Sequence, residues 1–93
     1  MNEIHEYRKT SAEALGYTWC MKGFLSVVCD KDSGSKILWE PDEYADQMLM
    51  VWEWFREQKR NIDILEIIDK YIFFDETLFN ATMEVFIKYQ NTL

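Results

Sequence analysis

The sequence predicts an α+β fold in which helices pack on an antiparallel sheet, in the order α-β-β-β-α-β-α. Apolar residues recur at helical spacing in three segments, which predicts three amphipathic helices. Between the first two segments lies a stretch rich in aromatic and β-branched residues and divided by turn-forming residues, which is typical of short strands. The 93 residues are 48% hydrophobic and contain no linker or repeat, so residues 1–93 are expected to form a single α+β domain.

A first helix is predicted over residues 2–15, where Ile4, Tyr7, Ser11, Ala14 and Leu15 keep a helical period. Gly16 follows, and glycine is the residue that most often ends a helix in a left-handed conformation.

A meander of three strands is predicted from Tyr17 to Trp39. Two β-prone runs within residues 17–29 are separated by Lys22-Gly23, which indicates a turn. The polar cluster at 31–35 indicates a second turn, and a third β-prone run follows at 37–39. A β-hairpin across residues 24–39 is therefore expected.

The amphipathic segment at residues 40–60 predicts a central helix. Pro41 suits the first helical position, and Asp42, Glu43 and Asp46 suit the positive end of the helix dipole. Basic residues at 56–60 suit the negative end, and Asn61 is expected to end the helix. The side chains expected to face the core are Tyr44, Ala45, Met48, Leu49, Val51, Trp52 and Phe55.

Residues 61–74 fit two structures. Ile62, Leu65, either Ile68 or Asp69, and Ile72 fit a helical period, whereas the abundance of isoleucine and aromatic residues favours strands with a turn at Asp69-Lys70. Composition favours strand, and the predicted order follows that choice.

A last helix is predicted after Asp75, which is a suitable N-cap residue. Its expected buried side chains are Leu78, Phe79, Thr82, Met83, Val85, Phe86 and Tyr89.

The net charge of −7 is unevenly distributed, because residues 1–40 carry six acids and five bases whereas residues 41–93 carry eleven acids and five bases. Phosphate backbones and anionic lipids repel such a chain, so direct binding of nucleic acid or membrane is not expected, whereas a basic protein surface would attract it. The sequence shows no secretory signal and no apolar run long enough to span a membrane. A cytoplasmic protein with Cys20 and Cys29 as free thiols is therefore expected, and one disulfide is the alternative.

The residue types that carry catalysis are scarce, so the sequence predicts no enzyme, no cofactor and no metal site. His5 is the single histidine and fits a solvated or half-packed side chain better than a general base. Neither cysteine belongs to a CxxC pair, so a zinc site is not indicated. Turn chemistry accounts for the acids at residues 30–32.

The central helix carries an acidic stripe opposite its expected core face, made of Asp42, Asp46, Glu53 and Glu57. Like charges four residues apart do not stabilise a helix, and the preference for acids at a helix start does not explain Glu53 and Glu57. Met50 and Trp54 lie beside the stripe and have the composition of a binding anchor. The alternative is that a second layer covers this side and that Trp54 belongs to the core.

Three motifs resemble those of the phage ABA-sandwich family of small phage and prophage proteins. They are Glu13-Ala14-Leu15-Gly16-Tyr17-Thr18-Trp19, the segment from Trp39 to Asp46, and the aromatic run Val51-Trp52-Glu53-Trp54-Phe55. The match covers roughly residues 12–57. Asp42 stands where the family usually has serine, and the last helix also departs from the family's pattern. The resemblance implies an α/β/α sandwich and a phage origin, and it brings no catalytic residues.

These observations predict a small acidic phage protein that inhibits a host defence or nucleic-acid-handling protein, as anti-CRISPR proteins do. Its expected partner is a host protein with a basic surface, such as a CRISPR effector, bound by mimicry of nucleic-acid charge. The predicted partner-binding residues are Asp42, Asp46, Met50, Glu53, Trp54 and Glu57. One alternative is a self-assembling phage protein with a homodimer patch at Met50, Trp54 and Ile87. Another is a protein that sequesters a small ligand between its tryptophans.

Overall fold

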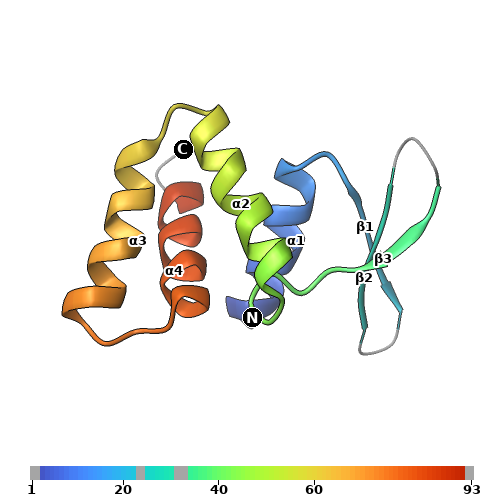
Figure 1. The fold of residues 1–93 in the computed structure, drawn as a ribbon. Helices are drawn as coiled ribbons and strands as arrows, with labels where there is room; N and C mark the ends of the chain where they lie inside the picture. The colour runs from blue at the N-terminus through green and yellow to red at the C-terminus, as the bar shows by residue number, and fades with distance from the viewer. Residues whose placement is uncertain (1–2, 23–24, 31–33, 92–93) are drawn as a thin grey trace. The chain divides into compact units, whose positions relative to one another are not determined.

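The computed structural model describes residues 3–22, 25–30 and 34–91, and its chain divides into two compact units, Met1–Glu40 and Pro41–Leu93. The first, the N-terminal unit, contains α1 (Glu3–Ala14), β1 (Thr18–Lys22), β2 (Leu25–Cys29) and β3 (Lys36–Leu38). The second, the helical unit, contains α2 (Ala45–Glu57), α3 (Asn61–Phe73) and α4 (Leu78–Asn91) (Figure 1). The α+β class is confirmed, and the strand predicted at 61–74 is wrong.

Helix α1 ends as the sequence predicted. Gly16 has φ 89°, and its N–H donates to the carbonyl of Glu13 at 3.1 Å. The N–H of Tyr17 donates to the carbonyl of Ala12 at 2.9 Å, which completes a Schellman motif. This reversal leads the chain directly into β1.

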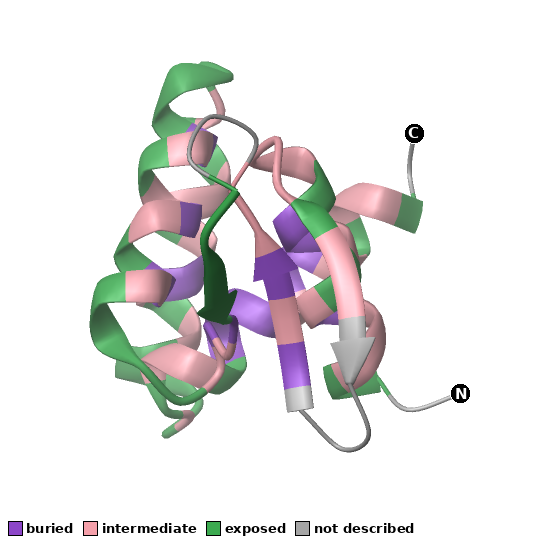
Figure 2. Ribbon diagram, turned by 90° about the vertical axis from the view of Figure 1, so that its right-hand side faces the viewer, coloured by how far each residue is buried: buried purple, intermediate pink, exposed green. Residues whose placement is uncertain are grey.

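The three strands form an antiparallel meander in the order β1-β2-β3, as predicted. Trp19 pairs with Val28 across β1 and β2, and Val28 pairs with Ile37 across β2 and β3. Helix α1 packs against β1 and β2, and buried residues follow the middle strand whereas β3 is exposed (Figure 2). Of the predicted turns, Gly23 and residues 31–33 lie outside the described residues.

Two side-chain hydrogen bonds and an ion pair hold the core of the N-terminal unit. The ring nitrogen of Trp39 donates to Ser11 Oγ at 3.0 Å, and both residues are buried. Arg8 donates to Ser26 Oγ at 3.1 Å and forms an ion pair with Glu40 at 3.2 Å. Tyr7 and Val28 are fully buried in the same unit. The indole N–H and the guanidinium therefore have partners where few waters reach them.

Helix α2 begins at Ala45, four residues later than the sequence suggested. Pro41 and the two acids after it form a turn, and Tyr44 is extended at φ −108° and ψ 122° as the N-cap. Proline followed by acidic residues suits a turn as well as a helix start, because proline's fixed φ fits the second position of a type I turn.

Helix α2 ends in a second Schellman motif, this time without glycine. Lys59 has φ 58°, its N–H donates to the carbonyl of Arg56, and the N–H of Arg60 donates to the carbonyl of Phe55 at 2.9 Å. Asn61 therefore begins the next helix instead of ending α2, which corrects the predicted boundary.

Residues 61–73 form helix α3, because a helical row of side chains contacts the rest of its unit. Ile67 is fully buried, and α3 packs against α4 and α2. Lys70 pairs with Glu84 at 3.2 Å and Lys88 pairs with Glu66 at 2.9 Å, so two ion pairs join α3 to α4. The β-propensity of isoleucine is weak beside such packing, and Asp69-Lys70 is mid-helix rather than a turn.

Helix α4 is capped by Thr77 rather than by Asp75. The N–H of Asn80 donates to Thr77 Oγ1 at 3.1 Å, whereas Asp75 adopts a left-handed conformation with φ 55°. The predicted apolar face of this helix is confirmed in part. Thr82, Met83, Val85 and Phe86 are buried, together with Ala81, whereas Leu78, Phe79 and Tyr89 are half-buried. Among the described helices, none is long and apolar enough to cross a bilayer.

Candidate partner-binding surface

The exposed face of α2 holds three of the four predicted acidic residues. Asp46, Glu53 and Glu57 are all exposed, while the opposite row of the helix, Met48, Val51 and Phe55, is buried. Intervals of seven and four residues place the three carboxylates on one side of the helix, in separate turns. Asp42 is half-buried in the turn before α2, so it does not belong to this helical stripe. We call Asp46, Glu53 and Glu57 the acidic face.

An apolar side chain that the sequence assigned to the core belongs to this same face. Leu49 is 53% exposed and lies three residues after Asp46 and four before Glu53. Tyr44, also expected in the core, is 44% exposed. The predicted buried stripe was too wide, because only the row through Met48, Val51 and Phe55 is buried. Leu49 therefore offers apolar contact beside Asp46 and Glu53.

One basic side chain partly balances the acidic face. Arg56 pairs with Glu53 at 3.5 Å, with side chains 70% and 59% exposed. A solvent-exposed pair of this kind is weak, typically about 0–1 kcal/mol, and a binding partner can replace it. The acidic face therefore remains net negative, with three carboxylates against one guanidinium.

Trp54 packs inside the helical unit. Its ring centroid lies 5.5 Å from that of Phe86, 5.4 Å from that of Tyr89 and 5.3 Å from that of Phe55. Trp54 and Met50 are both half-buried. The alternative to a binding role for Trp54 was that a second layer of the protein covers this side of α2. Helix α4 is that layer, so Trp54 has a structural role whether or not it also binds a partner. Trp54→Ala would therefore remove packing from the helical unit itself.

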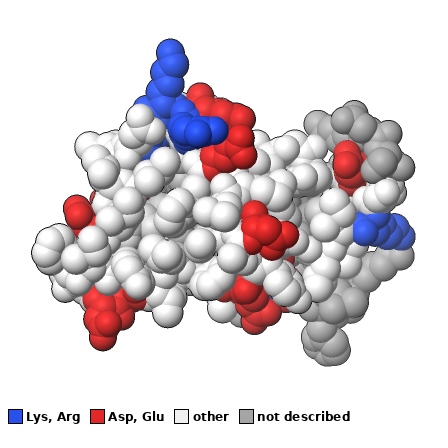
Figure 3. Space-filling model, viewed as in Figure 1, with Lys and Arg blue, Asp and Glu red and all other residues white. Residues whose placement is uncertain are grey.

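A second exposed surface lies on α3 and was missed by the sequence analysis. Ile62, Leu65, Ile72 and Phe73 are between 60% and 74% exposed, and Phe74, just after the helix, is 72% exposed. In Figure 3 the surface over α3, at the left of the view, is mostly uncharged, with acidic groups at its edge. The 3-4-3 spacing of residues 62, 65, 69 and 72 predicts that they share one face of a helix. The prediction of a strand hid this face, because residues at that spacing do not share one face of a strand.

One titratable cluster joins α3, the following loop and α4. Burial and the carboxylate of Glu84 raise the pKa of Glu76. The Oε2 atom of Glu76 is buried and has no hydrogen-bond partner among the described residues. The hydrogen bond to Glu84 raises the pKa of Lys70. Asn80 also donates to Glu84, at 3.4 Å. The cluster places three charged groups together, and the ion pair it contains links two helices.

The described residues contain no group of three or more histidine, cysteine or acidic side chains placed to hold a metal ion. His5 contacts Trp19 edge to face at 5.5 Å between ring centroids, which is the half-packed setting expected for it. The sulfur atoms of Cys20 and Cys29 lie 3.7 Å apart on β1 and β2, and no disulfide joins them.

Comparison of the chain with known protein families, with characterised proteins and with solved structures found no match. Membership of the phage ABA-sandwich family therefore stays a prediction.

Proposed function

We propose that this protein is a non-enzymatic inhibitor that binds a basic groove on a host protein that handles nucleic acid. The observation that carries the proposal is the acidic face of α2, where three exposed carboxylates lie on one side of the helix and two of them, Asp46 and Glu53, are helical neighbours of the exposed Leu49. The carboxylates would occupy positions that phosphates take on the partner. An anti-CRISPR role is the specific form of this proposal. The phage origin of the protein, which that role requires, is inferred from the sequence resemblance alone.

The charge distribution supports this mode of binding. The helical unit carries eleven acids and five bases, and four of those bases already pair with acids within the unit, namely Arg56, Arg60, Lys70 and Lys88. An acidic surface speeds encounter with a basic groove and excludes partners of like charge. Leu49 would add contact from which water is removed, as apolar anchors do at interface centres.

Capture from a bacterial lysate tests the proposal when it includes charge variants. Glu53→Lys with Glu57→Lys reverses two charges of the acidic face. Glu3→Lys with Glu13→Lys changes the net charge equally at two exposed positions of α1. We expect the unmodified chain and the α1 variant to retain a nucleic-acid-binding protein at low salt and release it at high salt, whereas the α2 variant retains none. Retention by the α2 variant, or retention insensitive to salt, would contradict the proposal.

The two alternatives have less structural support. Met50, Trp54 and Ile87, the predicted homodimer patch, are all half-buried. The ring nitrogens of Trp39 and Trp52 donate hydrogen bonds within their own units, and Trp54 lies among aromatic rings. These contacts give three of the four tryptophans structural roles, which does not favour a ligand pocket built from them.

A further inference from the structure

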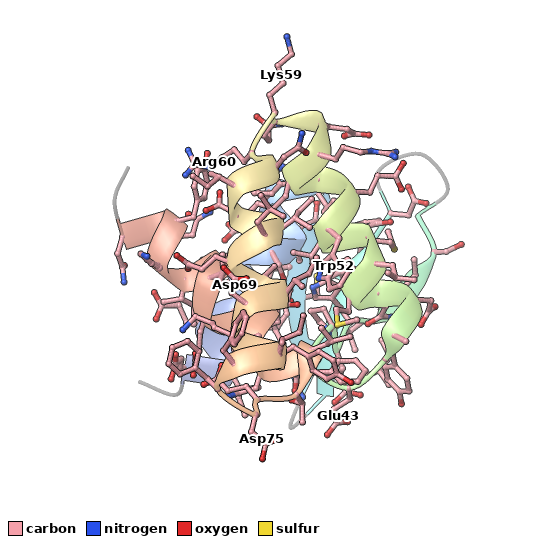
Figure 4. All side chains as sticks on the ribbon, turned by 60° about the vertical axis from the view of Figure 1, so that its left-hand side comes forward. Glu43, Trp52, Lys59, Arg60, Asp69 and Asp75 are labelled. Carbon is pink, nitrogen blue, oxygen red and sulfur yellow. The ribbon has the colours of Figure 1, made fainter. Side chains whose placement is uncertain are left out.

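Helix α3 presents an apolar stripe to solvent with one acid at its centre. Ile62, Leu65 and Ile72 are exposed, and Asp69 takes the position between Leu65 and Ile72 in the same 3-4-3 row. Asp69 lies midway along α3 (Figure 4), and none of the ion pairs among the described residues includes it. The helix thus carries an apolar surface that its own unit does not cover.

We propose that this face of α3 is a docking surface for an amphipathic helix of another protein, which brings a lysine or arginine opposite Asp69. The proposal goes beyond the acidic face of α2, because it concerns a different helix and a mainly apolar contact.

The size of the face fits a docked helix. Ile62, Leu65, Ile72, Phe73 and Phe74 are at least 60% exposed. Together they offer on the order of 600 Å² of apolar surface, given that an aromatic side chain alone spans about 150–250 Å². The largest apolar patch on an ordinary monomer is about 300–600 Å² and is often functional, and a standard interface buries about 800 Å² per partner. One helix laid along α3 would cover most of this area.

The spacing of the stripe specifies a helical partner. Positions 62, 65, 69 and 72 alternate by three and four residues, as the a and d positions of a heptad do. Side chains at that spacing form ridges and holes that accept the side chains of a second helix. An extended strand, with its period of two, would contact only part of the row.

The carboxylate of Asp69 makes a second copy of this chain an unfavourable partner for the stripe. In an antiparallel pair of α3 helices Asp69 would face Leu65 of the other copy, and in a parallel pair it would face the other Asp69. Both arrangements bury carboxylates without a cation, because Lys70 is paired with Glu84 and Arg60 with Asp63. Removing an unpaired charge from water is strongly unfavourable. A basic residue from a different protein neutralises Asp69 and thereby selects the partner.

Two matched peptides test the charge at this position. Each is an amphipathic helix of about three heptads with leucine at the a and d positions, carrying either one lysine or one glutamate at the central a position. Anisotropy of the labelled peptide is measured against the purified full chain. We expect the lysine peptide to bind about tenfold tighter or more, and Asp69→Lys to reverse the preference.

Asp75→Lys is the control, because it makes the same charge change at an exposed acid outside the stripe and is expected to keep the preference for lysine. Equal binding of the two peptides by the unmodified chain, or no binding of either, would overturn the proposal. Glu53→Lys with Glu57→Lys should leave the ratio of the two peptide affinities unchanged, so this test and that of the acidic face can fail independently.

Self-association provides the second measurement. We expect the unmodified chain to be monomeric by light scattering and Asp69→Leu to dimerise, because that substitution completes the apolar row. An unmodified chain that is dimeric and becomes monomeric on Leu65→Lys would show that a second copy occupies α3. An Asp69→Leu chain that stays monomeric would show that the stripe does not pair with a helix. Either result would overturn the proposal.

Discussion

The ring nitrogen of Trp52 donates a hydrogen bond to the hydroxyl of Thr82 at 2.8 Å, which joins α2 to α4. That hydroxyl in turn donates to the carbonyl of Leu78 at 2.6 Å. The contact fixes how two of the three helices in the helical unit pack, and therefore which side of α2 remains exposed.

Replacing Thr82 by valine keeps the shape of the side chain and removes the acceptor for Trp52. We expect a loss of about 1–2 kcal/mol in the free energy of unfolding, because the indole N–H is left without its partner in a partly buried position. Urea denaturation measures this loss. The double substitution with Trp52→Phe should cost less than the sum of the two single changes, and additive costs would show that the hydrogen bond does not couple the helices.

Lys59→Gly is expected to stabilise the protein by about 1 kcal/mol. Lys59 adopts φ 58° in the Schellman motif that ends α2, a conformation that costs about 1–2 kcal/mol for a residue with a Cβ. Lys59→Ala is the matched control, because it removes the same charge and keeps the Cβ. A glycine variant that unfolds at the same urea concentration as the alanine variant would contradict the assigned backbone strain.

Trp54→Ala is expected to destabilise the helical unit by about 2–4 kcal/mol, since it removes a ring that contacts Phe55, Phe86 and Tyr89. Glu53→Ala, the neighbouring change on the exposed face, is expected to cost less than about 0.5 kcal/mol. Thermal unfolding followed by circular dichroism compares the two variants. Equal stability would show that Trp54 is a surface residue available for binding.

Glu76→Gln is expected to raise stability at neutral pH. The folded protein raises the pKa of Glu76 through burial and the carboxylate of Glu84, so it binds that proton more tightly than the unfolded chain does. The resulting penalty is absent below the ordinary glutamate pKa of about 4.3, grows as the pH rises through the raised pKa, and is complete above it. Glutamine removes the penalty.

The gain from Glu76→Gln should therefore disappear when urea unfolding is repeated at a pH below about 4. Glu43→Gln, at an exposed acid in the turn before α2, serves as the control and should show no such change. A Glu76→Gln gain that is equal at both pH values would contradict the assigned cause.

Local turn chemistry made part of the fold predictable. Gly16 identified the end of α1, and the polar cluster before residue 36 identified the connection between β2 and β3. The same reasoning failed at Pro41, whose fixed φ fits a turn and a helix start equally. It also failed at Lys59, because a left-handed lysine has no sequence signature.

Tertiary packing accounts for the remaining differences between the predicted and the observed structure. Composition favoured a strand at 61–74, whereas the burial of Ile67 and the ion pair between Lys70 and Glu84 accompany a helix. The acidic face was predictable because the helical period places Asp46, Glu53 and Glu57 together whichever residue begins α2. The exposure of Leu49 was not predictable, because an apolar residue at the margin of a stripe can face either way.

If the acidic face of α2 takes the place of nucleic acid on its partner, the chain and a nucleic acid cannot bind that partner together. The most direct test is competition between this chain and a labelled single-stranded oligonucleotide for the captured partner, followed by anisotropy. We expect that the unmodified chain releases the oligonucleotide and that Glu53→Lys with Glu57→Lys does not. Simultaneous binding of the chain and the oligonucleotide to the partner would contradict this expectation.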